Sequence, residues 1–218
     1  MSRSDNYFSH ARKLYKRFIR SDSRKTPRAC TFSDTLFESV HHGNPYSDFI
    51  LCDFMPHCDN CLFIIRHAWA EEVSEDGSDR SRSLTKKGRR RFEEVMSRLV
   101  EQGLTIDRIA TSPLTRAKQT AEIVAAMLPN KPRIDIVEWL APGSNWQAAI
   151  DWSIKSGAQK VAWVGHAPDV GSLVSRAIGA SGASIAMAKG SVASIHFPQN
   201  FGENGFLEWL ITAGLLGC

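Results

Sequence analysis

The stretch Cys61-Leu-Phe-Ile-Ile-Arg-His-Ala68 decides the fold of this chain. Five apolar residues follow one another without interruption and stop at an Arg–His pair. Such a run is typical of a β-strand that is buried on both faces, as in the parallel sheet of an α/β protein. In open α/β sheets, ligands bind beyond the carboxyl ends of the strands. Arg66 and His67 therefore mark a candidate binding site, and their chemistry favours an anionic ligand.

Strand-like and helix-like segments alternate after this stretch. The sequence predicts helices over 85–102, 114–128 and 146–156, with another that opens at Pro168 or Asp169, and strands over 106–111, 133–137, 160–165, 191–197 and 206–212. The assignments rest on apolar periodicity and on capping residues at the helix ends. This order predicts an α/β fold, a three-layer α/β/α sandwich with a mainly parallel central sheet.

Two later segments place further polar side chains at the same edge of the predicted sheet. Arg116 lies in the first turn of the helix after strand 106–111, and His166 ends strand 160–165. Because the carboxyl ends of parallel strands meet at one edge, we expect both to lie beside Arg66 and His67. Arginine donates bidentate hydrogen bonds to phosphate oxygens, and a neutral imidazole can accept a phosphoryl group. The pattern predicts a phosphate site that can perform covalent catalysis.

With these motifs, the sequence resembles the histidine phosphatase superfamily, whose fold is called phosphoglycerate-mutase-like. The resemblance covers about Cys61 to Thr212 and rests on three motifs in the family's order: Arg66-His67-Ala68, Ser112-Pro113 continuing to Arg116-Ala117 and Gln119-Thr120-Ala121, and Gly165-His166. The small SixA-type phosphohistidine phosphatases look most similar, since this chain also lacks the long insertion that larger phosphoglycerate mutases carry as a lid.

The resemblance implies that His67 is the nucleophile, which is phosphorylated transiently and then freed by water. Arg66, Arg116 and His166 would complete the phosphate pocket. It also implies that the reaction needs neither a metal ion nor an organic cofactor.

Two carboxyl groups are candidates for the general acid. Glu138 lies near the position where larger relatives place their acid, and Asp79 lies in the loop after the first strand. A phosphoramidate needs protonation but leaves readily, so a strong acid is dispensable if the substrate is phosphohistidine. The leading hypothesis is a metal-independent phosphatase that acts on phosphohistidine of a signalling or phosphocarrier protein. The alternatives are a small-metabolite phosphomonoesterase of the same superfamily and a non-catalytic phosphate-binding module.

Charge is distributed unevenly along the chain, whose formal net charge is +4. The first 28 residues contain nine Lys and Arg against only Asp5 and Asp22. We expect residues 1–57 to be a basic, poorly defined extension, with Met55 an alternative start, and 58–218 to be the phosphatase domain. The remainder is nearly balanced, which argues against nucleic-acid binding, and it contains no apolar stretch that suits stable membrane association.

The cysteines favour a reduced, cytoplasmic protein. Their number, five, is odd, and the sequence contains no secretory segment. Cys58 and Cys61 have the spacing of half a zinc site, but a structural zinc ion needs a second pair of ligands. No metal site is therefore expected.

Overall fold

The computed structural model describes residues 60–180, 182–202 and 204–218. Both the basic extension and Cys58 lie outside the described residues. The elements, in chain order, are β1 (Cys61–Arg66), η1 (Asp79–Ser81), α2 (Lys86–Glu101), β2 (Arg108–Thr111), α3 (Thr115–Met127), β3 (Arg133–Ile136), η2 (Glu138–Leu140), α4 (Trp146–Lys155), β4 (Lys160–Gly165), α5 (Asp169–Ala177), β5 (Val192–His196) and β6 (Phe206–Ile211).

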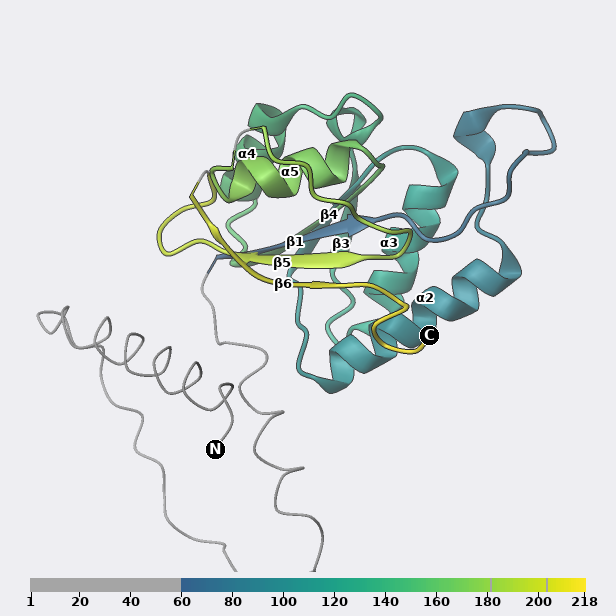
Figure 1. Ribbon diagram of the computed structural model, residues 1–218, viewed down its shortest axis with the longest axis horizontal. Helices are drawn as coiled ribbons and strands as arrows, with labels where there is room; N and C mark the ends of the chain where they lie inside the picture. Colours follow the sequence, from purple (N-terminus) through teal and green to yellow (C-terminus); the bar gives the residue numbers. More distant parts are fainter. Residues whose placement is uncertain (1–59, 181, 203) are drawn as a thin grey trace, which may run out of the picture. The chain divides into compact units, whose positions relative to one another are not determined.

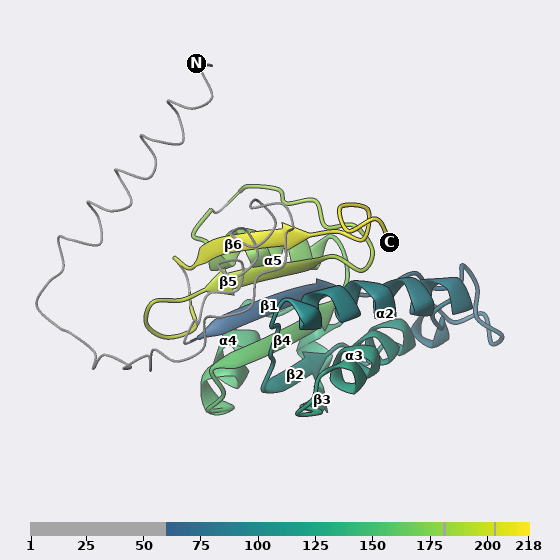
Figure 2. The ribbon, with the colours of Figure 1, turned by 90° about the horizontal axis from the view of Figure 1, so that it is seen from below.

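The strands form one sheet in the order β3-β2-β4-β1-β5-β6. The pairs β1–β4, β2–β4 and β2–β3 are parallel, whereas β5 pairs antiparallel with both β1 and β6. Helices α4 and α5 cover one face of the sheet, and α2 and α3 cover the other (Figures 1 and 2). The predicted three-layer sandwich with a mainly parallel sheet is therefore confirmed.

Strand β1 lies in the interior of the sheet and is buried on both faces. Phe63 and Ile65 pack in the apolar cluster that includes residues of α2 and α3, and Leu62 and Ile64 pack in the cluster that includes residues of α4 and α5. Successive side chains of a strand point to opposite faces. The uninterrupted apolar run in the sequence follows from this position, because both faces of the strand need apolar residues.

Helix α2 begins and ends where its sequence predicts. The Thr85 side chain accepts a hydrogen bond from the backbone N–H of Gly88, which caps the first turn. The buried residues Phe92, Val95, Met96 and Leu99 follow the helical period. Gly103, with φ of +91°, then turns the chain away from the helix.

Two details differ from the sequence-based predictions. Strand β2 begins at Arg108 rather than at residue 106, and the Asp107 carboxylate accepts the Lys160 backbone N–H just before it. The N-cap of α5 is Pro168 and its first helical residue is Asp169, so the Asp169 side chain does not cap the helix. The Asp169 carboxylate instead accepts the backbone N–H of Gly143 at 2.7 Å, which ties the loop before α4 to α5.

None of the helices in the described residues combines the length and apolar character that crossing a bilayer requires.

Candidate active site

Parallel pairing of two strands brings the two histidines together. Arg66 ends β1 opposite Gly165, which ends β4, and the backbone N–H of His67 donates to the Gly165 carbonyl at 3.0 Å. His67 and His166 therefore follow adjacent strands at the same edge. Their ring centroids are 5.1 Å apart, and both residues are buried. This is the convergence that the sequence predicts.

The two arginines reach this edge from different layers of the sandwich. Arg66 follows the alternation of Leu62 and Ile64 and so faces the α5 side of the sheet, where its Nη1 donates to the Met187 carbonyl at 2.7 Å. Arg116 comes from the first turn of α3, on the opposite face. An anion at the strand ends would lie between two guanidinium groups.

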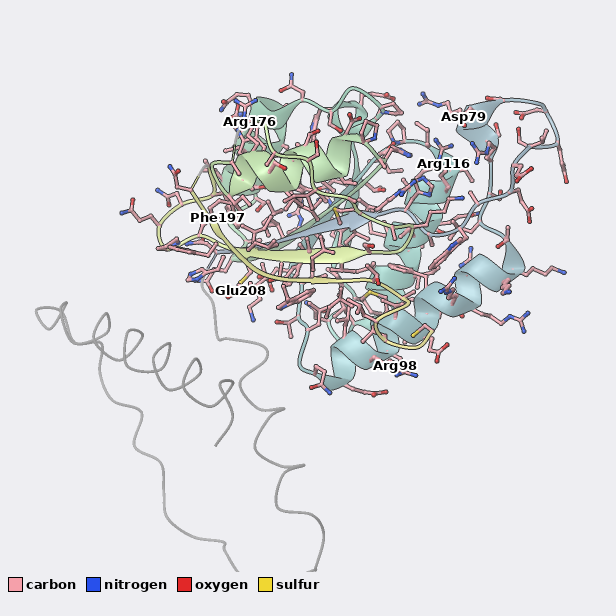
Figure 3. The ribbon with its side chains drawn as sticks, viewed as in Figure 1. Asp79, Arg98, Arg116, Arg176, Phe197 and Glu208 are labelled. Carbon is pink, nitrogen blue, oxygen red and sulfur yellow. The ribbon has the colours of Figure 1, made fainter. Side chains whose placement is uncertain are left out.

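Arg116 is held by Asp79 of η1 (Figure 3). Its Nη1 donates to the Asp79 backbone carbonyl at 2.7 Å, and its Nη2 donates to the Asp79 carboxylate at 2.9 Å. Arg82 donates to the other oxygen of the same carboxylate at 2.6 Å. Asp79 thus fixes the direction of a buried guanidinium, and the sequence gives no sign of the part that Arg82 plays.

The tautomer of His67 follows from its hydrogen bond. Its Nδ1 lies 2.7 Å from the carbonyl oxygen of Ala68, which can only accept, so Nδ1 carries the proton. The Nε2 lone pair is then available as a nucleophile. Thr120 fixes the same backbone unit, because its hydroxyl accepts the Ala68 N–H at 3.1 Å and donates to the Arg116 carbonyl at 2.7 Å.

Burial keeps His67 neutral. The pKa of His67 is lowered to about 3: burial is the largest cause, the Ala68 hydrogen bond opposes it, and electrostatic interactions with His166, Arg116 and Arg66 add to the lowering. The pKa of His166 is lowered to about 4, mainly by burial and then by the charge of Arg116. Both imidazoles are therefore uncharged at neutral pH, as a nucleophile requires.

Ser112 orients His166, a role that the sequence analysis missed. The Ser112 hydroxyl lies 2.8 Å from Nε2 of His166 and accepts the Leu114 backbone N–H at 3.3 Å. Its own proton can therefore go to Nε2, which leaves the proton of the neutral His166 on Nδ1. Within the described residues, buried Nδ1 has no hydrogen-bond partner. It is a donor that a phosphate oxygen would satisfy.

The two carboxyl groups proposed as general acid both lie in ion pairs. The pKa of Asp79 is lowered, first by the hydrogen bond from Arg82 and then by that from Arg116, so its carboxyl group is ionised at neutral pH. Glu138, at the start of η2, contacts Nη2 of Arg80 at 3.1 Å, and its side chain is 75% exposed. Both candidate acids are therefore held by arginine side chains in this arrangement.

The low histidine pKa values predict an unusual pH profile. We expect protonation of His67 and His166 in the free enzyme to lower kcat/KM only near pH 4, so these two groups should cause no loss of kcat/KM between about pH 8 and about pH 5. An activity loss with a midpoint near 6.5 would contradict this. Titration of the His67 and His166 ¹⁵N chemical shifts checks the assignment without any substrate.

The free energy of unfolding should also depend on the protonation of these two histidines. Because the folded-state pKa values of His67 and His166 lie below the unfolded value of about 6.5, the unfolded chain takes up protons first as the pH falls. The free energy of unfolding should therefore decrease below about pH 6.5. Urea titrations at several pH values measure the decrease, and the variant His67→Gln should show a shallower one.

Removing the Ser112 hydroxyl should disturb His166 without removing it. We expect Ser112→Ala to lower kcat by about tenfold, because His166 then divides between two tautomers and offers Nδ1–H less often. The ¹⁵N shifts of the His166 ring should show the mixed tautomer, which a purely structural loss would not produce. Ser156→Ala, which removes a hydroxyl that caps its own helix end, serves as the control. Unchanged His166 shifts would contradict the assignment.

Comparison with known proteins supports one family. The family model of the histidine phosphatase superfamily, branch 1, matches residues 62–141. An uncharacterized protein of Picosynechococcus sp. is 39% identical over 113 residues, which are 50% of this chain and 68% of that protein. The rat mitochondrial serine/threonine-protein phosphatase PGAM5 is 36% identical over 74 residues, 34% of this chain and only 25% of its own length.

A solved structure of similar fold indicates the branch of the superfamily to which this chain belongs. The protein histidine phosphatase SixA, complexed with tungstate, superposes with a TM-score of 0.62 at 25% identity, over 72% of this chain and 99% of that chain. The phosphoglycerate-mutase-like fold that the sequence implies is therefore confirmed. Together with the converging arginines and histidines, these matches show that the chain is a hydrolase of the histidine phosphatase superfamily and belongs to its SixA-like branch.

Proposed function

We propose that this phosphatase removes phosphate from phosphohistidine on a protein, with His67 as the transient phosphoryl acceptor. The observation that carries the proposal is the Nδ1–H···O bond from His67 to Ala68, which leaves Nε2 as a neutral nucleophile between two guanidinium groups. Arg66, Arg116 and Nδ1–H of His166 would bind the equatorial phosphoryl oxygens.

The proposed reaction has two steps, transfer of the phosphoryl group to His67 and its hydrolysis. Nε2 of His67 attacks phosphorus, the P–N bond of the substrate breaks, and the substrate imidazole leaves. Water then attacks phospho-His67, and its P–N bond breaks to release phosphate and restore the imidazole. Neither step changes an oxidation state, and both use charge stabilisation by the arginines.

The state of the carboxyl groups favours a phosphoramidate over a phosphate ester. Among the described residues, the carboxyl groups of Asp79 and Glu138 are both paired with arginines, so neither is free to serve as an acid in this arrangement. A serine alkoxide is a poor leaving group that needs such an acid. The imidazole of phosphohistidine can instead take a proton from solvent on its other ring nitrogen, whose basicity is that of ordinary histidine. It then leaves as a neutral ring.

One assay tests the proposal directly. The chain is mixed, in the presence of EDTA, with a protein that carries radiolabelled phosphohistidine, and samples are quenched in alkali, where phosphohistidine survives. We expect released phosphate and a transient alkali-stable label on this chain. Faster turnover of sugar or nucleotide phosphates would favour the metabolite phosphatase. Neither label nor phosphate would favour a phosphate-binding module.

The match to PGAM5 favours one further candidate, hydrolysis of phosphoserine or phosphothreonine on a protein. The variant Glu138→Gln separates the two substrates. If phosphohistidine is the substrate, we expect Glu138→Gln to change kcat by less than about threefold, because an acid is dispensable. If a phosphate ester is the substrate, removal of its acid should lower kcat by about a hundredfold. Asp79→Asn should raise KM in both cases by loosening Arg116.

A further inference from the structure

A basic patch lies on the first two turns of α2, and it consists of Lys86, Lys87, Arg89 and Arg90. The side chains of Lys86, Lys87 and Arg90 are exposed, and that of Arg89 is half-buried. Because α2 connects two parallel strands, β1 and β2, it begins at the edge of the sheet where β1 ends (Figure 1). The patch is therefore at the same edge as the candidate active site.

Trp69, two residues after His67, fixes the beginning of α2. The Trp69 carbonyl accepts the Thr85 backbone N–H at 2.9 Å, and it lies so close to Gly88 that a Cβ there would collide with it. The Arg91 guanidinium lies over the Trp69 ring, 4.3 Å from its centroid. The start of the helix is thus tied to the backbone that carries the nucleophile. A partner bound to the basic patch would have a fixed position relative to His67.

The cations of the basic patch disfavour the helix on which they lie. The first turns of a helix carry partial positive charge, which repels cations, and the first turn of α2 contains no acidic residue. Lys86 and Arg90 are also four positions apart, where like charges repel each other. Among the residues that the structure describes, no ion pair includes a cation of the patch. Such a conflict within an element is expected where the surface serves a function.

An acidic loop adjoins the basic patch. Ala70 and Leu84 form an isolated β-bridge, so the chain between them leaves and returns just before α2. This loop has four exposed carboxyl groups, those of Glu71, Glu72, Glu75 and Asp76. A membrane or a nucleic acid is negative over a broad area, so the loop would repel it. A protein can instead present a small acidic surface, which suits a patch of this size.

We propose that an acidic surface of the substrate protein docks on the basic patch of α2 and so holds its phosphohistidine at His67. The inference rests on the proposed function and names the chemistry of the partner surface. Complementary charges raise the association rate and orient the partner as it approaches. The chain's own N-terminal extension does not fit, because its first 28 residues contain nine Lys and Arg against two Asp.

The first test compares substrates that differ in charge. Peptides of about ten residues carry one phosphohistidine with about four Glu before or after it, or Gln at the same positions, and capped phosphohistidine is the small reference. We expect kcat/KM at about 50 mM salt to be at least about tenfold higher for one of the Glu peptides than for its Gln counterpart. At about 0.5 M salt this advantage should shrink to less than about threefold, because salt screens exposed charges.

The second test removes the exposed charges of the patch with the triple variant Lys86→Gln, Lys87→Gln, Arg90→Gln. We expect kcat/KM for the preferred Glu peptide to fall by about tenfold and that for capped phosphohistidine to change by less than about twofold. The melting temperature should not fall, because the variant removes cations from the positive end of a helix. A lower melting temperature, with equal losses on both substrates, would indicate a structural role and contradict docking.

The matched control is the triple variant Arg98→Gln, Lys131→Gln, Lys155→Gln. It also removes three exposed cations, but they follow the strands' amino edge: Arg98 and Lys155 are in the last turns of α2 and α4, and Lys131 precedes β3. The change in net charge is the same as in the patch variant. We expect the control to change kcat/KM for the Glu peptide by less than about twofold.

The outcomes separate this inference from the proposed function. If none of the substrates releases phosphate, the proposed function fails and this inference falls with it. If Glu and Gln peptides are hydrolysed equally well, or if the control variant loses as much activity as the patch variant, the proposed function stands and the docking inference is overturned. Tighter binding of single-stranded RNA or phosphatidylserine vesicles than of the Glu peptide to the patch also overturns it.

Discussion

Replacing His67 with alanine is expected to abolish phosphate release and the transient label on the chain. The substitution removes Nε2, the one atom to which the phosphoryl group transfers in the proposed mechanism. Loss of a catalytic nucleophile lowers kcat by five to six orders of magnitude in well-studied hydrolases, so we expect a fall of at least about 10⁵-fold. Single-turnover experiments with radiolabelled phosphohistidine protein measure both the label and the free phosphate.

The control for this variant is its ability to bind an anion. The only side-chain hydrogen bond described for His67 goes to the adjacent Ala68 carbonyl, so its removal should leave the fold and both arginines in place. We expect tungstate to raise the melting temperature of His67→Ala and of the unchanged chain by similar amounts in a thermal shift assay. A label that persists on the variant would show that another residue accepts the phosphoryl group.

Replacing Arg116 with alanine should produce the second-largest loss. Arg116 is the buried cation on the α3 side of the site, and it would stabilise the charge that spreads over the phosphoryl oxygens. Removal of one such donor lowers kcat by about 10²–10³-fold in other enzymes, and we expect a similar loss here. Arg116→Lys should recover only part of it, since an ammonium group lacks the planar, two-pronged geometry.

A double variant separates catalysis from stability in this case. Arg116→Ala leaves the Asp79 carboxylate without one of its partners, which could itself weaken the fold. Adding Asp79→Asn removes that charge, so it should restore the melting temperature without restoring kcat/KM. Arg98→Ala, which breaks an exposed pair with Glu94 on α2, should alter neither quantity. Recovery of activity in the double variant would contradict the role given to Arg116.

The sequence predicts the layout of the site because that layout depends on strand ends. Arg66, His67 and His166 follow strands whose apolar runs are visible in the sequence, and parallel pairing brings such ends together. Arg116 is predictable for the same reason, since it opens the helix after a strand. For these four residues, the local sequence pattern and the strand topology are enough to predict their location at one edge of the sheet.

The hydrogen bonds that orient these residues could not be predicted in the same way. Ser112 and Thr120 belong to motifs that the sequence displays, but their roles depend on distances of about 3 Å across strands and helices. The arginine partners of Asp79 and Glu138 could not be predicted from the sequence either. Arg80 lies in the three-residue η1 and Arg82 follows it directly, and an element this short has no periodicity that indicates the direction of a side chain.

The backbone that carries the candidate site residues is held more firmly than the segment that follows α5. The N–H groups of Arg66 and His67 donate to Ser191 and Gly165, whereas no backbone partner among the described residues accepts those of Ser184–Met187. Amide hydrogen exchange should therefore be slow at Arg66 and His67 and fast along Ser184–Met187. For the evolution of this protein, it follows that Ser184–Met187 can change in sequence more freely than the end of β1.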